Sequence, residues 1–453
     1  MLDQIKIKNF KSWKELDIHI SSITGLFGPN SSGKSSLLQF LLMLKQTKET
    51  SDRSLALNFR SSYINLGTFK DVIFNHQTDE EMTWSIGWSM PNTLKIADPF
   101  NKSSILFEGQ KISLEAQVSL ISKQLMTNLL QYCFAEHQFR LKQQKNKKNS
   151  FAMNVEGKTD FSFIRNQGRV WDIPNPIKSY IFPDQAKTYY QNAGLLSDFE
   201  FSYEALMDKI FYLGSLREHP KREYIWSGSR PLDVGSKGER VVDALLSARA
   251  KNETRSLGHR KKRKTFEEMI AYWLKELGLI SEFKVLEIAP DSNLYKVQVK
   301  KDSQSTAVLI TDVGFGISQL LPVLVLLYYV PKNSIVLLEH PEIHLHPAAQ
   351  SGLADIIINA SQTRNIQVIV ESHSEHLLRR LQRRVAEEEI ENTAISLYFS
   401  QTKSGKSKLT PLVLNEFGEI NNWPQDFFGD EFGEVAATQK ASLKRKIEKA
   451  ENS

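Results

Sequence analysis

The sequence predicts an α/β protein built on a parallel or mixed sheet, with antiparallel strands at its N-terminus and a helical insertion. Residues 23–42 pass from a short apolar stretch through a glycine-rich loop into a leucine-rich segment typical of a helix. Two later stretches, Ile335–Leu338 and Ile366–Val370, are almost continuously apolar, as strands buried on both faces are. Both are followed by ionisable residues, and ligands bind at the carboxyl ends of parallel strands. We therefore expect a binding site at one edge of this sheet.

The composition limits the class of protein. The chain has 453 residues, a formal net charge of +6 and a single cysteine, Cys133. One cysteine excludes a disulfide framework and a cysteine-based zinc site, and it suits a reducing compartment. The first residues do not resemble a signal peptide, and the apolar runs 320–330 and 335–338 are too short to span a bilayer. We expect a cytoplasmic protein that does not contact a membrane.

The glycine-rich loop has the spacing of a phosphate-binding loop. Gly28 is followed by four residues and then by Gly33, Lys34 and Ser35, which gives G-x-x-x-x-G-K-S. The free N–H groups of the following helix and its dipole favour anions, Lys34 adds a positive charge, and Ser35 offers a hydroxyl to Mg²⁺. A chance match in a turn is the alternative, but a strand and a helix flank the motif as the chemistry requires. The residues predicted to contact the phosphates of ATP are Asn30, Ser31, Ser32, Gly33, Lys34, Ser35 and Ser36.

Other elements follow from local patterns along the chain. Apolar residues alternate in the first twenty residues, and they recur with helical spacing from Phe266 to Leu277. In chain order, the patterns predict a hairpin over 2–20, a helix over 35–46, short strands within 81–120, helical segments within 111–141, a helix near 241–246, a helix over 266–277 and a hairpin over 283–299.

These elements suggest four regions. Residues 1–95 form the N-terminal half of the nucleotide-binding unit, 96–204 an inserted and largely helical region, 205–435 the second half, and 436–453 a charged tail. The most basic stretch, Arg255–Lys264, lies in the second half. It has two interpretations: a solvated loop, or a surface that contacts the phosphate backbone of a nucleic acid.

The second half carries a further set of polar residues around Gly316 and Ser318. Residues 312–319 lead into an apolar helix, and Ser318 is predicted to cap it. A capped helix start beside glycines is a second candidate anion site, although an ordinary capped helix has the same pattern. Glu339 follows the buried run 335–338, where a carboxylate beside a phosphate loop holds the metal in the Walker B arrangement.

The residues after Glu339 have two interpretations. His340, Glu342, His344 and His346 follow within a proline-bounded segment, and such a cluster could bind zinc. However, the histidines lack the i, i+4 spacing of a helical zinc motif. The second buried run is followed by Glu-Ser-His-Ser-Glu-His, which contains His373.

The order of these motifs resembles that of an ABC-type ATPase of the RecF and structural-maintenance-of-chromosomes (SMC) class. The resemblance rests on the phosphate loop, the glycine and serine segment, Leu-Leu-Glu-x-Pro-Glu-x-His-Leu-His-Pro and Glu-Ser-His-Ser-Glu-His. It is strongest to the branch related to the overcoming-lysogenization-defect ATPases and covers about 1–95 and 205–435. Residues 418–428 resemble the tail of a bacterial subgroup often found in phage-defence loci.

The resemblance implies an ABC-type head that dimerises around ATP and Mg²⁺. Lys34 and Ser35 of one copy would face Gly316 and Ser318 of another, in a homodimer or a higher homo-oligomer. Glu339 would sit at the Mg²⁺ site with Ser35, and His373 would match the switch histidine that senses the γ-phosphate. The catalytic residues implied in this way are Lys34, Glu339, His340, Glu342 and His373.

The sequence departs from the family pattern at two places. The signature reads Gly-Phe-Gly-Ile-Ser-Gln instead of Leu-Ser-Gly-Gly-Gln, and His340 stands where the catalytic glutamate usually follows the Walker B acid. A neutral His340 could act as the base, or Glu339 or Glu342 could orient the water. Our hypothesis is slow hydrolysis and a long-lived ATP-bound dimer.

Three functions are compatible with these motifs. The first is a switch that controls a separate effector, such as a nuclease or a toxin, or a DNA-associated process, as part of anti-phage defence. The second is an ATP-dependent nuclease of the overcoming-lysogenization-defect type, although such relatives carry a further metal-binding domain after the switch histidine. The third is the ATPase subunit of a transporter, which the large insertion and the histidine-rich motif argue against.

Overall fold

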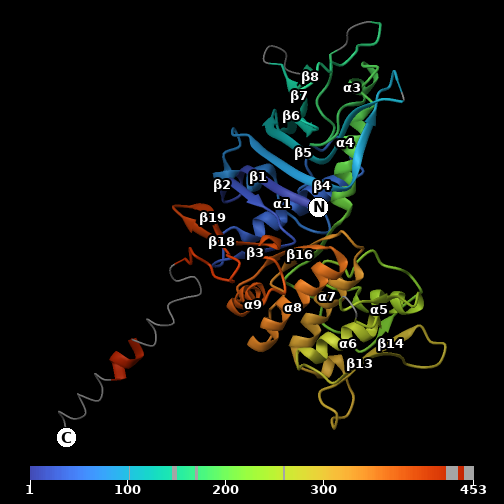
Figure 1. Cartoon of the computed structure of the whole chain (residues 1–453), viewed down its shortest axis with the longest axis vertical. Coiled ribbons are helices and arrows are strands. Elements are labelled where there is room, and N and C mark those ends of the chain that lie inside the picture. The colour runs from blue at the N-terminus through green and yellow to red at the C-terminus, as the bar shows by residue number, and fades with distance from the viewer. Residues whose placement is uncertain (102, 145–149, 169–171, 259–260, 425–436, 443–453) are drawn as a thin grey trace.

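The computed structural model describes residues 1–101, 103–144, 150–168, 172–258, 261–424 and 437–442. Figure 1 shows an elongated molecule with a broad antiparallel sheet at one end and a group of helices at the other. A second, largely parallel sheet lies between them and ends beside the glycine-rich loop. This central sheet positions the candidate site.

The antiparallel sheet has seven strands in the order β2-β1-β4-β5-β6-β7-β8. Its first two strands form the predicted hairpin, in which Ile5 pairs with Ile18 and Ile7 with Leu16. Alternate residues of these strands are buried, as a half-buried sheet requires. The strands are β1 (Leu2–Phe10), β2 (Trp13–His19), β4 (Met82–Ala97), β5 (Ile105–Ile121), β6 (Gln124–Phe134), β7 (His137–Gln143) and β8 (Phe151–Gly157).

The prediction that 96–204 is largely helical, including helical segments within 111–141, is wrong. Strands β5 to β8 occupy most of this region, and the short strands expected within 81–120 are the two long strands β4 and β5. Residues 112, 114, 116 and 118 are buried while their neighbours are partly exposed, which is the two-residue period of a strand. The residues between them are polar (Ser113, Glu115 and Gln117), so the strand period is present in the sequence itself.

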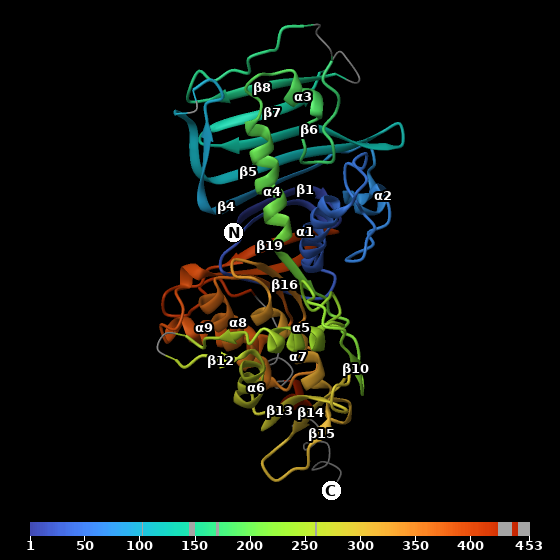
Figure 2. The ribbon, with the colours of Figure 1, turned by 90° about the vertical axis from the view of Figure 1, so that its right-hand side faces the viewer.

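Helices cover one face of the antiparallel sheet. Figure 2 shows α4 (Leu195–Asp208) running across this sheet toward the central sheet. Ring contacts hold it there: Phe199 lies 5.0 Å from Phe139 and Tyr203 lies 6.1 Å from Trp88, measured between centroids. The other helical elements on this side are α1 (Lys34–Glu49), α2 (Phe69–Val72), η1 (Phe74–His76) and α3 (Asp184–Thr188).

The central sheet has six strands in the order β19-β18-β3-β17-β16-β9. All neighbouring pairs are parallel except β18 with β19. Val336 and Leu338 of β16 pack into one core, whereas Ile335 and Leu337 pack into another on the opposite face. The two predicted buried strands are therefore confirmed. The strands are β3 (Ile23–Phe27), β9 (Ile210–Leu213), β16 (Ile335–Glu339), β17 (Gln367–Glu371), β18 (Ile395–Lys403) and β19 (Lys406–Leu412).

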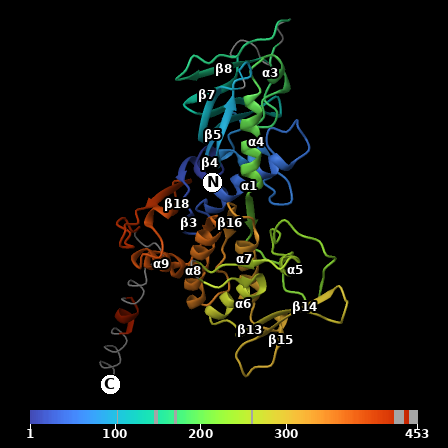
Figure 3. The ribbon, with the colours of Figure 1, turned by 45° about the vertical axis from the view of Figure 1, so that its right-hand side comes forward.

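The remaining helices pack on the other face of the central sheet. In Figures 1 and 3, α7 (Phe315–Tyr329) and α8 (Pro347–Arg364) lie side by side beneath it. The predicted helix at 266–277 is α6 (Phe266–Glu276), which begins with a capping box formed by Thr265 and Glu268. The others are α5 (Val241–Ala250), α9 (Glu375–Ala386), η2 (Ile310–Asp312) and η3 (Asn392–Ala394).

Short strands complete this helical end. The predicted hairpin at 283–299 is confirmed as β13 and β14, in which Val285 pairs with Val297. The short strands are β10 (Tyr224–Ile225), β11 (Thr254–Arg255), β12 (Lys264–Thr265), β13 (Glu282–Glu287), β14 (Leu294–Lys300) and β15 (Val308–Leu309). Within the part of the chain that the structure describes, no helix combines the length and the apolar character needed to cross a bilayer.

Candidate nucleotide-binding site

The glycine-rich loop lies between β3 and α1, as the motif predicts. Gly28 has a φ of +134°, and a Cβ there would lie 2.1 Å from the carbonyl oxygen of Ser400, so only glycine fits. Helix α1 begins at Lys34, and the first-turn N–H groups of a helix have no carbonyl partner within it. The loop therefore ends at a helix start that favours phosphate.

Neighbouring strands support the backbone of the loop. The Ser400 hydroxyl of β18 donates a hydrogen bond of 2.6 Å to the carbonyl of Ser32, and Trp13 Nε1 donates one of 3.1 Å to the carbonyl of Gly33. Ser32 is buried. The other predicted phosphate contacts besides Lys34 are half-buried or exposed: Asn30, Ser31, Gly33, Ser35 and Ser36.

Lys34 is folded back onto its own loop. Its residue is only 3% exposed, and Nζ donates to the carbonyls of Gly28 at 3.0 Å and Pro29 at 2.8 Å. Nζ also lies 3.9 Å from a carboxylate oxygen of Glu371. Burial lowers the Lys34 pKa, while the Glu371 charge opposes that shift. A triphosphate would offer this lysine stronger acceptors than two carbonyls.

Ser35 contacts a carboxylate that the sequence reasoning did not select. Its hydroxyl donates a hydrogen bond of 2.8 Å to Oε1 of Glu371, the last residue of β17. Burial raises the Glu371 pKa, and the Ser35 hydrogen bond acts in the opposite direction. A sequence signal did exist, because Glu371 is the ionisable residue at the end of a buried parallel strand.

Glu339 is the predicted partner of Ser35 at the metal site. It is the last residue of β16. Its carboxylate is hydrogen-bonded by the hydroxyl of Tyr212 and the backbone N–H of Ser215. Burial raises its pKa, and the nearby Glu371 raises it further. Because β17 separates β16 from β3, the carboxylate in contact with Ser35 is that of Glu371 rather than that of Glu339.

The structure brings His340, Glu342 and His373 together. The backbone N–H of His373 donates a hydrogen bond of 2.8 Å to Oε1 of Glu342, and the two imidazoles stack with their centroids 4.9 Å apart. The nearby carboxylate of Glu342, whose Oε1 lies 3.8 Å from Nδ1 of His340, raises the pKa of His340, whereas burial lowers that of His373. Burial works to raise the Glu342 pKa, but the nearby His340 ring and the hydrogen bond from the His373 backbone lower it overall.

Arg217 is a second residue that the sequence reasoning did not select. It is buried, and its guanidinium donates to the carbonyls of Gln319 at 3.0 Å and of Glu339 and His340 at 3.2 Å each. Burial lowers its pKa to about 10. Arg217 thereby fixes the end of β16 to the start of α7. One arginine in a loop rich in basic residues gave no sequence signal for this contact.

The predicted role of Ser318 as a helix cap is wrong. The N-cap of α7 is Gly314, and the Ser318 hydroxyl donates 2.8 Å back to the carbonyl of Phe315 within the first turn. Ser318 is buried, whereas Gly314 and Phe315 are exposed and Gly316 is half-buried. Any anion that meets this helix start would contact the backbone of 314–316 rather than the Ser318 side chain.

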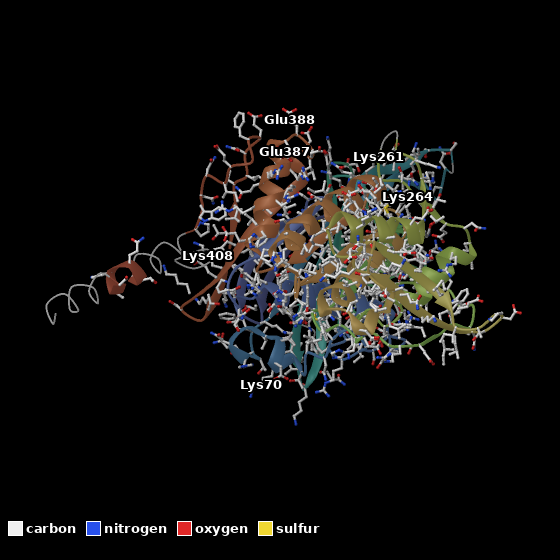
Figure 4. The ribbon with its side chains drawn as sticks, turned by 90° about the horizontal axis from the view of Figure 1, so that it is seen from below. Lys70, Lys261, Lys264, Glu387, Glu388 and Lys408 are labelled. Carbon is white, nitrogen blue, oxygen red and sulfur yellow. The ribbon has the colours of Figure 1, made fainter. Side chains whose placement is uncertain are left out.

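The basic stretch Arg255–Lys264 is partly used within the molecule. Arg255 donates to the carbonyl of Tyr328 at 2.8 Å, and Arg263 donates to Thr254 at 2.8 Å. Lys261 and Lys264 lie on the outside of the molecule in the view from below (Figure 4). A nucleic-acid contact through this stretch stays a prediction, and Arg255 is not free to join it. Residues 259 and 260 lie outside the described residues.

The donors present suit magnesium better than zinc. No three or more of His, Cys, Asp and Glu form a metal-binding group among the residues that the structure describes, as a structural zinc site would require. Mg²⁺ is instead held by one or two carboxylates together with phosphate oxygens and water. Ser35 and Glu371 fit such an ion. They offer a hydroxyl and a carboxylate in contact with each other, and Oε2 of Glu371 is buried without a hydrogen-bond partner.

The fold and the loop define a class. A phosphate-binding loop between a strand of a largely parallel sheet and a helix, with acidic and histidine residues at the ends of the adjacent strands, is that of a P-loop ATPase domain. The chain belongs to the family described as "AAA domain, putative AbiEii toxin, Type IV TA system", whose model matches residues 23–379. A second family model, described as a protein of unknown function (DUF3696), matches residues 390–437. The predicted ATPase class agrees with this family model, and the ABC-type branch of RecF and SMC stays a prediction.

Solved structures similar to this chain include three SMC heads. One is an SMC head bound to the C-winged helix domain of ScpA, with 14% identity, a TM-score of 0.48, and coverage of 92% of this chain and 98% of that chain. The SMC head domain from Thermotoga maritima has 11% identity and a TM-score of 0.41, covering 91% of this chain and 99% of that one. The head with an extended coiled coil bound to the C-terminal domain of ScpA, from Pyrococcus furiosus, has 12% identity and a TM-score of 0.43, covering 91% and 96%. No curated protein matches the sequence significantly.

Proposed function

We propose that this P-loop ATPase is a slowly hydrolysing switch, in which two copies close over ATP and control a separate effector in anti-phage defence. One observation carries the proposal. The buried Lys34 and the Ser35 hydroxyl lie at the sheet edge where Glu371, Glu339 and His340 also gather. Phosphoryl transfer is mainly a matter of positioning and of neutralising charge, and this edge supplies both.

Slow hydrolysis follows from the residue after Glu339. His340 occupies the place where an acidic residue would act as base, and the nearby carboxylates of Glu342 and Glu371 raise its pKa. A raised pKa favours the protonated imidazole, which cannot accept a proton from water. We therefore expect a turnover below about ten per second, the median for enzymes. Such an enzyme stays in its ATP-bound form long enough to act as a switch.

The exposed start of α7 supports a dimer. A helix of 15 residues presents free N–H groups at 314–316, and Phe315 is 48% exposed beside them. In a closed dimer this helix start would meet the phosphates bound by Lys34 and Ser35 of the other copy. Hydrolysis would then depend on assembly, which suits control of an effector. The family description, which names a toxin and a toxin–antitoxin system, also supports an effector partner.

The test is purification from the native operon, comparing the wild type with Lys34→Ala. We expect the wild-type chain to form an ATP-dependent dimer and to retain a bound protein partner. We expect Lys34→Ala to lose ATP binding and the dimer. Native mass and the composition of the complex are the measurements, together with steady-state phosphate release.

Four outcomes would contradict the proposal. A Lys34→Ala variant that hydrolyses ATP normally would overturn the site. A wild-type turnover well above about ten per second would overturn the slow switch. Metal-dependent DNA cleavage by the purified chain, or its recovery with a membrane protein, would favour the nuclease or the transporter subunit instead.

A further inference from the structure

The order of strands places Glu371, rather than Glu339, next to the phosphate loop. β17 pairs in parallel with β3 on one side and with β16 on the other. In these pairs Glu371 lies opposite Leu26 of β3 and opposite Glu339 of β16. Neighbouring strands are about 4.8 Å apart, so Glu339 is one strand further from the loop.

The contacts of the Glu371 and Glu339 carboxylates also place Glu371 nearer to the phosphate loop. Oε1 of Glu371 accepts the Ser35 hydroxyl at 2.8 Å and lies 3.9 Å from Lys34 Nζ and 3.6 Å from Nε2 of His340. Its other oxygen, Oε2, is buried without a hydrogen-bond partner. Glu339 is hydrogen-bonded by Tyr212 and by the N–H of Ser215, on the side of β9.

An unpartnered carboxylate oxygen in a buried site is costly unless a cation or a donor meets it. Glu371 also lies where a bound triphosphate would bring several negative charges close to its own. Like charges in a buried site repel strongly, and a divalent cation between them turns the repulsion into attraction. The carboxylate would therefore oppose free ATP and favour ATP that carries a metal ion.

We propose that Glu371 binds the Mg²⁺ of the bound nucleotide together with Ser35, and that this carboxylate makes the site select metal-bound ATP over free ATP. This inference rests on the proposed function, because it presumes that the loop binds ATP. Glu339 then does not bind the metal ion directly, because Tyr212 holds it beside Glu371. The arrangement gives Mg²⁺ the hydroxyl and carboxylate oxygens that it prefers.

The experiment measures ATP affinity with Mg²⁺ and with EDTA for the wild type, Glu371→Gln and Glu371→Asp. Glu200→Gln is the matched control, because Glu200 is another buried carboxylate and belongs to α4, outside the site. Mn²⁺ binding in the presence of ADP, followed by electron paramagnetic resonance, gives a second readout that does not depend on turnover. Binding of ATP in EDTA also shows that each variant is folded.

We expect Glu371→Gln to lose at least about tenfold in Mn²⁺ affinity while it binds ATP in EDTA as well as the wild type or better. Its preference for ATP with Mg²⁺ over ATP with EDTA should fall by a similar factor. Glu371→Asp should keep part of that preference, and Glu200→Gln should keep all of it. A Glu371→Gln variant with the full wild-type preference would overturn this inference and leave the proposed function standing. A wild-type chain that binds no ATP would overturn both.

Discussion

The imidazoles of His340 and His373 stack with their planes only 6° apart, although they follow different strands. β16 and β17 run in parallel and in register, so the residues after them emerge at the same edge. Glu342 contacts both histidines, through the His340 ring and the His373 backbone. The predicted switch histidine, His373, and the residue in the place of the catalytic glutamate, His340, are therefore in direct contact and share Glu342.

His373→Ala should separate hydrolysis from binding. The change removes one ring of this stack but leaves the contacts of Lys34 and Ser35 in place. We expect turnover to fall at least about 100-fold, within the range for loss of an acid–base group, while ATP affinity stays within about threefold. Single-turnover kinetics and equilibrium binding are the measurements. His376→Ala, at an exposed position on α9, is the control, and an equal loss in that variant would refute the assignment.

Arg217→Met should loosen the end of β16 from the start of α7. The change removes one donor from each of the carbonyls of Gln319, Glu339 and His340, and each lost hydrogen bond costs free energy. The His340 carbonyl still accepts from the backbone N–H of Ile343. We expect the free energy of unfolding to fall by about 2–4 kcal/mol, with a lower turnover, as measured by urea denaturation and phosphate release.

Arg222→Met is the control for this prediction. Arg222 forms an exposed ion pair of 2.8 Å with Asp312, and such pairs contribute at most about 1 kcal/mol. If the free energy of unfolding falls equally in both variants, the hydrogen bonds of Arg217 stabilise the fold no more than an exposed ion pair does.

Phe315→Glu should prevent the ATP-dependent dimer without unfolding the chain. Phe315 is 48% exposed at the start of α7, where a glutamate would bring negative charge to phosphates bound by another copy. Light scattering with and without ATP measures the dimer. Phe417→Glu, at a residue that is 68% exposed in the C-terminal part, should dimerise normally. Ser318→Ala should also dimerise, because its hydroxyl faces its own helix; loss of the dimer in that variant would restore the serine to the interface.

Glu200 should make the stability depend on pH. Burial raises its pKa from 4.5 to about 7, against the opposing effect of Lys187. As pH rises from about 4.5 to 7, the unfolded chain loses this proton first, so the folded state is progressively destabilised relative to the unfolded state. The free energy of unfolding should fall by up to about 3 kcal/mol across this window and change little above it.

Glu200→Gln should remove this dependence. Urea denaturation of the wild type and Glu200→Gln at several pH values measures the difference, with Glu276→Gln at an exposed position as the control. A difference between wild type and Glu200→Gln that is constant from pH 4.5 to 8 would refute the prediction.

The local sequence pattern was sufficient to predict an element whose own residues determine its conformation. The phosphate loop was predictable from its glycines and Lys34, and α6 from apolar residues at helical spacing. It failed in β5 to β7, although β5 shows the two-residue period of a strand, because residues four apart on one strand face, such as Ile112 and Ala116, also match the i, i+4 spacing of a helix. It also failed at Ser318, where the helix begins earlier than the serine suggested.

The sequence by itself determined which groups could meet a nucleotide: a lysine and a serine after a glycine turn, and acidic and histidine residues after two buried strands. Only the tertiary structure decided which of them touch. Hydrogen bonding between strands is set by the whole sheet, and it inserts β17 between β3 and β16. For that reason Ser35 meets Glu371, while Glu339 turns to Tyr212. No local spacing encodes such a neighbour, because contacts between distant segments depend on how every strand is paired.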